Sequence, residues 1–154
     1  MAVFPPPSET RALRLTLPPT GRLTAADKWH VTLAFLGEVA PEPVAAALSD
    51  VPPAGPFDLQ LAGGGQFGSA AWAGLTGDLS ALTALRSKVR DGLASGGFLP
   101  DDRPFRPHLT VSYHGDGSIR RALSAYEGKP WPVSEFALMR SSNGVYERLN
   151  AWPV

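Results

Sequence analysis

Apolar residues recur along this chain at helical spacing in some segments and at strand spacing in others. The clearest helix is predicted over 79–93, where apolar side chains follow one another at intervals of three and four, as Leu79, Leu82, Leu85, Val89 and Leu93. Shorter helices are predicted over 9–17, 43–48 and 119–126. Ser8 is the predicted N-cap of the first of these.

Strands are predicted where apolar and polar residues alternate, or where short apolar runs lie between Gly and Pro. These segments are 29–36, 57–62, 70–75, 108–113, 133–139 and 145–152. Gly63, Gly64 and Gly65 lack the lysine and the spacing of a phosphate-binding P-loop, so they predict a turn or a bulge. Because the last two strands are joined by a short turn, antiparallel pairing is favoured and an α+β fold is predicted.

One pattern occurs twice in the predicted strands. The segments His30-Val-Thr-Leu-Ala-Phe-Leu-Gly37 and His108-Leu-Thr-Val-Ser-Tyr-His-Gly115 share His, apolar, Thr, apolar, and a glycine seven positions after the first His. With threonine at about 5% of the residues, two of three histidines with Thr two positions later arise by chance in fewer than about one chain in a hundred. On a strand, His and Thr share one face and the apolar residues share the other.

The duplication predicts two similar lobes with approximate two-fold symmetry, each contributing its motif strand to a shared groove. Both histidines would then face one ligand. Since imidazole titrates near pH 6.5, one ring can accept a proton while the other donates one. Thr32 and Thr110 could each donate a hydrogen bond to a phosphate oxygen. This arrangement predicts acid–base cleavage of a phosphate ester by His30 and His108.

Composition narrows the function classes further. The chain has 154 residues, 44% of them hydrophobic and 18% charged, which suits a single domain over 1–154. Its 14 basic and 14 acidic residues balance, so binding of an extended duplex is disfavoured, whereas a local cluster can still hold a terminal phosphate. The sequence has no cysteine, and its one histidine besides His30 and His108 is His114. With carboxylates at no ligand spacing, neither a metal nor another cofactor is predicted.

Features of targeting are weak in this sequence. The apolar runs are too short to cross a bilayer, which takes about 20 residues, so no membrane partner is expected. Residues 1–7 have neither the basic stretch nor the apolar stretch of a secretory signal. A cytoplasmic monomer is therefore expected.

With its paired motifs and their flanks, the chain resembles the 2H phosphoesterase superfamily, and within it the RNA 2′,3′-cyclic phosphodiesterases, also called 2′-5′ RNA ligases. The flanks that carry the resemblance are Trp29, Phe35-Leu36-Gly37-Glu38, Trp72, Phe105-Arg106-Pro107, Arg140-Ser141, Tyr146 and Trp152-Pro153. The resemblance implies a bilobal fold in which two antiparallel sheets line a central cleft, with helices on the outside. It also implies opening of a terminal 2′,3′-cyclic phosphate, on RNA 3′ ends or nucleotides, to a 2′-phosphomonoester.

Residue by residue, His30 and His108 match the catalytic histidines of that superfamily, and Thr32 and Thr110 match its threonines. The resemblance implies that His108 acts as the base on water and His30 as the acid toward the 3′-oxygen. Many members carry a basic residue where this chain has Tyr113, which departs from the usual phosphate or RNA contact at that position.

Three further side chains are candidates for substrate contact. Arg106 lies two residues before His108, so an early strand start would bring both to one face, whereas Pro107 favours a later start. Phe35 and Tyr113 could stack a base, although aromatic residues on strands more often belong to the core.

Three alternatives use the same residues. The site could join a 2′,3′-cyclic end to a 5′-hydroxyl through a 2′-5′ bond, with an alcohol in place of water. It could instead act on a small molecule such as an ADP-ribose cyclic phosphate. From a different class, the chain could be a non-catalytic module that binds RNA ends or nucleotides. Neutral charge and Tyr113 favour this module, and the two complete motifs count against it.

Overall fold

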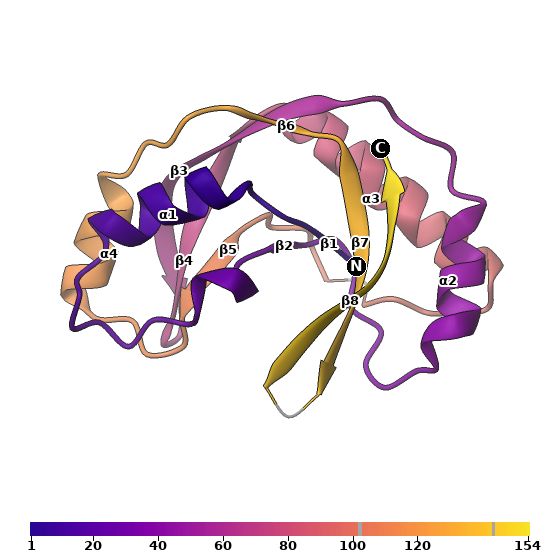
Figure 1. The fold of residues 1–154 in the computed structure, drawn as a ribbon, viewed down its shortest axis with the longest axis horizontal. Coiled ribbons are helices and arrows are strands. Elements are labelled where there is room, and N and C mark those ends of the chain that lie inside the picture. The colour runs from indigo at the N-terminus through magenta and orange to yellow at the C-terminus, as the bar shows by residue number, and fades with distance from the viewer. Residues whose placement is uncertain (102, 143) are drawn as a thin grey trace.

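The computed structural model describes residues 1–101, 103–142 and 144–154, which form an α+β fold. Its strands are β1 (Ala2–Val3), β2 (Val31–Thr32), β3 (Phe57–Phe67), β4 (Ala70–Gly77), β5 (Leu109–Ser112), β6 (Trp131–Val133), β7 (Glu135–Ser142) and β8 (Val145–Pro153). Its helices are α1 (Pro7–Thr16), α2 (Pro41–Ser49), α3 (Leu79–Ser95) and α4 (Gly117–Ser124), with a short 3₁₀ helix η1 (Ala26–Lys28). Figure 1 shows α1 and α4 on one side of the molecule and α2 and α3 on the other.

The described strands form a single antiparallel sheet in the order β6-β3-β4-β5-β2-β1-β7-β8. The expectation of two separate sheets is therefore wrong. The physical reason is that the two motif strands pair with each other, with Val31 of β2 opposite Leu109 of β5, so that both halves share one ladder. Four strands of the sheet lie on each side of the boundary between β5 and β2. The two-fold duplication of the lobes stays a prediction.

The sheet is strongly curled. β6 is one edge of the sheet and β7 lies next to the opposite edge, yet Ser134 alone separates them in sequence. The two ends of the sheet must therefore approach each other, as the arch at the top of Figure 1 shows. This crossover also explains why the single strand predicted over 133–139 divides into parts of β6 and β7.

The helical pattern predicted the helices more accurately than it predicted their caps. α3 buries Leu82, Leu85, Val89 and Leu93 as its periodicity predicts, and Asp78 caps it by accepting a hydrogen bond from the Ala81 amide at 2.8 Å. The expected Ser8 cap of α1 is wrong, because that helix begins at Pro7 and places Ser8 inside its first turn. Proline favours this position because its fixed φ already suits a helix start.

The motif strands are shorter than predicted. β2 contains Val31–Thr32 alone, because η1 ends just before Trp29 and the paired strand β1 contains only Ala2 and Val3. The Leu33 amide still donates to the Met1 carbonyl at 2.9 Å, in line with the β1–β2 register. β5 likewise begins after His108. The predicted alternation still holds, since Val31, Leu109 and Val111 are fully buried in the core.

The glycine triplet lies inside β3 and not in a turn. A register shift between Leu61 and Gly64 confirms the predicted bulge. A Cβ on Gly64 would lie 2.5 Å from the carbonyl oxygen of Trp72, and one on Gly65 would lie 2.5 Å from the Trp72 ring. These glycines therefore allow β4 and its indole to approach β3 closely.

None of the helices within the described residues combines the length and the apolar character needed to cross a membrane.

Candidate active site

The pairing of β2 with β5 brings the two motifs together. Continuing the Val31–Leu109 register by one residue in each direction places His30 opposite Thr110 and Thr32 opposite His108. Directly opposed residues on antiparallel strands share a face, with Cβ atoms about 4.5–5.5 Å apart. The two imidazoles and two hydroxyls therefore form a compact group with each histidine beside the threonine of the other motif.

Both histidines are oriented by the same backbone contact. The Nδ1 of His30 lies 2.7 Å from the carbonyl oxygen of Lys28, and the Nδ1 of His108 lies 2.6 Å from that of Arg106. A carbonyl can only accept, so each Nδ1 carries the hydrogen. Each Nε2 is then left to accept a proton when the ring is neutral, or to donate one when it is charged.

Each imidazole lies between two aromatic rings, but the rings differ. His30 contacts Phe4 and Tyr146, with ring centres 5.7 and 5.8 Å away. His108 contacts Phe67 edge-to-face at 5.2 Å and Trp72 at 6.1 Å. The aromatic rings on both sides limit the rotation of each imidazole.

The electrostatics of His30 favour its neutral form. Burial is the largest effect and lowers the pKa of His30 below its ordinary value of 6.5. The Lys28 carbonyl opposes this shift, and the positive charges of the amino terminus and of His108 add to it. At neutral pH the Nε2 of His30 therefore carries a lone pair.

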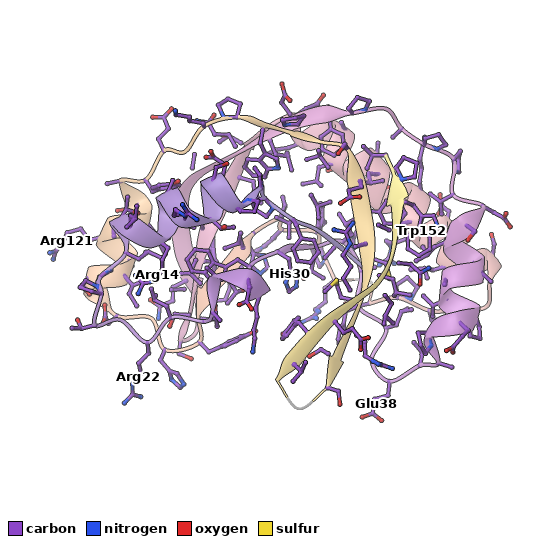
Figure 2. All side chains as sticks on the ribbon, in the orientation of Figure 1. Arg14, Arg22, His30, Glu38, Arg121 and Trp152 are labelled. Carbon is purple, nitrogen blue, oxygen red and sulfur yellow. The ribbon has the colours of Figure 1, made fainter. Side chains whose placement is uncertain are left out.

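The four motif residues open into a cleft of about 1110 Å³. Its walls include the loop after β2, the loop before η1 and the β7–β8 hairpin, which projects from the centre of the molecule in Figure 1. Figure 2 places His30 in the middle of the molecule beside this hairpin. A volume of this size is sufficient for a nucleotide or a short oligonucleotide end.

Of the three other predicted contact residues, two line the cleft and one does not. Phe35 and Tyr113 line the cleft and are 64% and 57% exposed, so both rings are available for stacking. Arg106 is exposed and does not belong to the described residues that line the cleft; its carbonyl orients His108 instead. Burial raises the pKa of Tyr113, with a further contribution from the neighbouring Tyr146, so the hydroxyl remains protonated.

Across the described residues, no three His, Asp or Glu side chains converge in a way that could hold a metal ion. His114 lies in the turn after β5, where its amide donates to the Ser112 hydroxyl at 3.0 Å. The polar side chains that the two motifs bring to the cleft are two imidazoles and two hydroxyls.

The curled antiparallel sheet and its adjacent His-x-Thr strands are the features expected of the 2H phosphoesterase superfamily. The chain belongs to the 2′-5′ RNA ligase superfamily, whose family model matches residues 4–145.

Known proteins resemble this chain in sequence and in structure. It is 34% identical over 145 residues to an RNA 2′,3′-cyclic phosphodiesterase of Geobacillus stearothermophilus, covering 83% of this chain but 46% of that protein. It is 33% identical over 129 residues to an Escherichia coli K12 protein of the same name, covering 81% of this chain and 73% of the relative. The chain thus spans less than half the length of the first relative. The crystal structure of E. coli LigT complexed with 3′-AMP has a TM-score of 0.75 at 28% identity, covering 99% and 95% of the two chains.

Sequence reasoning missed several of the side chains that surround the histidines, although Trp72 and Tyr146 were among the residues that carry the family resemblance. Phe4 and Phe67 lie far from either motif in sequence and reach the imidazoles through sheet pairing. Lys28 is one basic residue among many in the sequence, with no spacing that marks it as part of the site. Knowledge of strand register would have been needed to find them.

Proposed function

We propose that this protein hydrolyses terminal 2′,3′-cyclic phosphates, on RNA 3′ ends or nucleotides, to 2′-phosphomonoesters. The observation that carries the proposal is the cross-strand group of His30, Thr32, His108 and Thr110 in the cleft, with both Nε2 atoms free to exchange protons. The names of the curated relatives, and the nucleoside monophosphate bound to E. coli LigT, support this substrate class.

The reaction needs one base and one acid. A water oxygen attacks phosphorus while the base removes its proton, the bond from phosphorus to the 3′-oxygen breaks, and the acid protonates that oxygen. The threonine hydroxyls donate to the non-bridging oxygens, where a charge-assisted hydrogen bond strengthens as negative charge develops. These steps use no metal ion, which makes metal-independent turnover part of the proposal.

The lowered pKa of His30 favours it as the base, since a base must start without its proton. His108 would then donate the proton to the leaving 3′-oxygen. This assignment is the reverse of the one that the family resemblance implies. A substrate with sulfur in place of the 3′-oxygen distinguishes the two, because a thiolate leaves without protonation. This substrate should restore turnover to His108→Ala and not to His30→Ala. Restored turnover in His30→Ala alone would support the assignment implied by the resemblance, with His108 as the base and His30 as the acid.

Phe35 and Tyr113 are proposed to stack on the base of the terminal nucleotide, because both exposed rings line the cleft beside the motifs. No substrate contact is proposed for the Arg106 side chain. The expected result of Phe35→Ala is a higher KM for nucleotide substrates with a nearly unchanged kcat.

Phosphorus NMR of a 2′,3′-cyclic nucleotide incubated with the protein and EDTA tests the proposal directly. A 2′-monoester resonance should appear with the parent protein and not with His30→Ala or His108→Ala. If the cyclic signal persists, the same measurement on an oligonucleotide with a 2′,3′-cyclic end decides whether a longer substrate is needed. Persistence there as well would refute hydrolysis, and a joined product with a 5′-hydroxyl oligonucleotide would indicate ligation.

A further inference from the structure

The cleft contains few charged groups apart from its histidines and the amino terminus of Met1. Among the described side chains that line it, the charged ones are Lys28, Glu38 and Arg140. Arg140 is neutralised by an ion pair with Glu147, and Figure 2 places Glu38 at the lower edge of the molecule, away from His30. Within the part of the chain that the structure describes, Lys28 forms no ion pair. Its positive charge in the cleft is therefore unbalanced.

Lys28 is held directly beside the first motif. Its carbonyl accepts the Nδ1 hydrogen of His30 at 2.7 Å, so its backbone is fixed relative to the imidazole. Its Nζ donates to the carbonyl of Gly144 in the β7–β8 hairpin and lies 5.6 Å from the centre of the Tyr146 ring. That ring in turn lies 5.8 Å from the ring of His30. The ammonium thus connects η1 with the β7–β8 hairpin across the cleft, on the side where Tyr146 contacts His30.

The ammonium keeps capacity for a further ligand. A protonated lysine has three N–H donors, and the Gly144 carbonyl takes one of them. The face of Tyr146 attracts the positive charge but offers no lone pair. Donors therefore remain for an anion, and a lysine ammonium binds phosphate as a compact point charge.

We propose that Lys28 binds a phosphate oxygen of the substrate. The inference deepens the proposed hydrolysis and rests on it. The anion could be the reacting cyclic phosphate, or the phosphodiester that precedes the terminal nucleotide of an RNA. Both are phosphates in the same cleft, and substrates of different length distinguish them.

The test compares three substitutions at Lys28 with one control. Lys28→Met keeps the length of the stem and loses both charge and hydrogen bond. Lys28→Gln loses the charge but keeps an amide donor for the Gly144 carbonyl, and Lys28→Arg keeps the charge. Lys88→Met is the matched control, because Lys88 is a lysine outside the cleft-lining residues whose Nζ likewise donates to backbone carbonyls, those of Pro52 and Pro53. KM and kcat are measured for a 2′,3′-cyclic mononucleotide and for a dinucleotide with the same end, at low and high salt.

Lys28→Met and Lys28→Gln should both raise KM about tenfold or more, as expected for a hydrogen bond between charged groups, and lower kcat far less. Lys28→Arg should restore most of the affinity, and Lys88→Met should change KM by less than about twofold, because Lys88 lies outside the cleft lining. The parent KM should rise with salt more steeply than that of Lys28→Met. A rise in KM for both substrates would show that Lys28 binds the reacting phosphate. A rise in KM for the dinucleotide alone would show that Lys28 binds the preceding phosphodiester.

Two results would overturn the role of Lys28. One is an unchanged KM in Lys28→Met for both substrates. The other is parent-like behaviour of Lys28→Gln with a defect in Lys28→Met alone, which would show that the side chain merely anchors the hairpin through Gly144. Calorimetry with a nucleoside 2′-monophosphate separates this question from the proposed reaction. If the parent shows no turnover, the hydrolysis proposal fails, whereas a weaker Kd in Lys28→Met and Lys28→Gln still identifies Lys28 as a phosphate ligand.

Discussion

The two motifs use the same backbone device but are placed in different surroundings. In each, a carbonyl two residues upstream accepts the Nδ1 hydrogen, which leaves Nε2 for chemistry. Around His30, however, the neighbours are Phe4, Tyr146 and the backbone of Lys28, and burial lowers its pKa. Around His108 the neighbours are Phe67 and Trp72 from the β3–β4 hairpin.

This difference teaches how a repeated motif can supply two opposite roles. Identical sequence spacing fixes the tautomer and the orientation of both rings. The pKa of His30 depends instead chiefly on its burial among residues that the repeat does not duplicate. A base and an acid can therefore arise from one motif because its two copies are packed differently.

The largest expected effect is the loss of either imidazole. His30→Ala and His108→Ala should each reduce kcat by about 10²–10⁴, because each removes one half of the acid–base pair. Both positions are outside the fully buried core, so thermal unfolding should remain near that of the parent. Turnover assays and circular dichroism check the two statements. Parent-like turnover in either variant would contradict the two-histidine mechanism, and with it the assignment of different roles to the two histidines.

The threonines should respond next most strongly. Thr32→Val and Thr110→Val remove a hydroxyl with little change in shape, and each should lower kcat/KM by an amount equivalent to about 1.5–3 kcal/mol. Steady-state kinetics on a cyclic mononucleotide measures the effect. If the threonines bind opposite oxygens of one phosphate, the two losses should be similar. Unchanged kinetics in both would leave them as residues that favour the strand and nothing more.

How far the sequence predicts this site depends on the range of each interaction. The alternation of His30 and Thr32 with buried residues is local, and so the polar face of each motif followed from the sequence alone. The direct pairing of β2 with β5 is not local, since it joins residues 78 positions apart, and the family resemblance led instead to the expectation of two antiparallel sheets.

The same reasoning explains the errors in the secondary structure. α3 was predicted well because its own periodicity determines its buried face. β2 has two residues because its pairing partner β1 also has two, Ala2 and Val3, and no local pattern reveals the length of a partner strand. The role of Gly65 is likewise invisible until β4 places the Trp72 ring against it.

The packing of Trp72 against His108 gives a third test. A Cβ on Gly65 would lie 2.5 Å from the Trp72 ring, so Gly65→Ala must displace the indole, which contacts the His108 ring. We expect kcat to fall about tenfold with a smaller change in KM, because a modest misplacement of a catalytic group is costly. Gly117→Ala is a matched control, since a Cβ there meets nothing within 4 Å.

A second substitution distinguishes displacement of the ring from general damage to the strand. In the double variant Gly65→Ala/Trp72→Phe the smaller ring leaves room for the new methyl group, so part of the lost kcat should return. If Gly65→Ala is as active as the parent, the indole does not position His108.

The smallest expected effect concerns the proton affinity of His30. NMR titration of the imidazole signals should give His30 a pKa below 6.5, chiefly because of burial. In His108→Ala the pKa of His30 should rise, because the positive charge of His108 is one of the groups that lower it.

The lowered pKa of His30 also makes the stability of the protein depend on pH. Since the unfolded chain binds a proton at His30 more readily than the folded one, the free energy of unfolding should fall as the pH drops below 6.5. In His30→Gln the free energy of unfolding should change less steeply with pH. An identical pH dependence in parent and variant would show that burial does not lower the pKa of His30 below that of an exposed histidine.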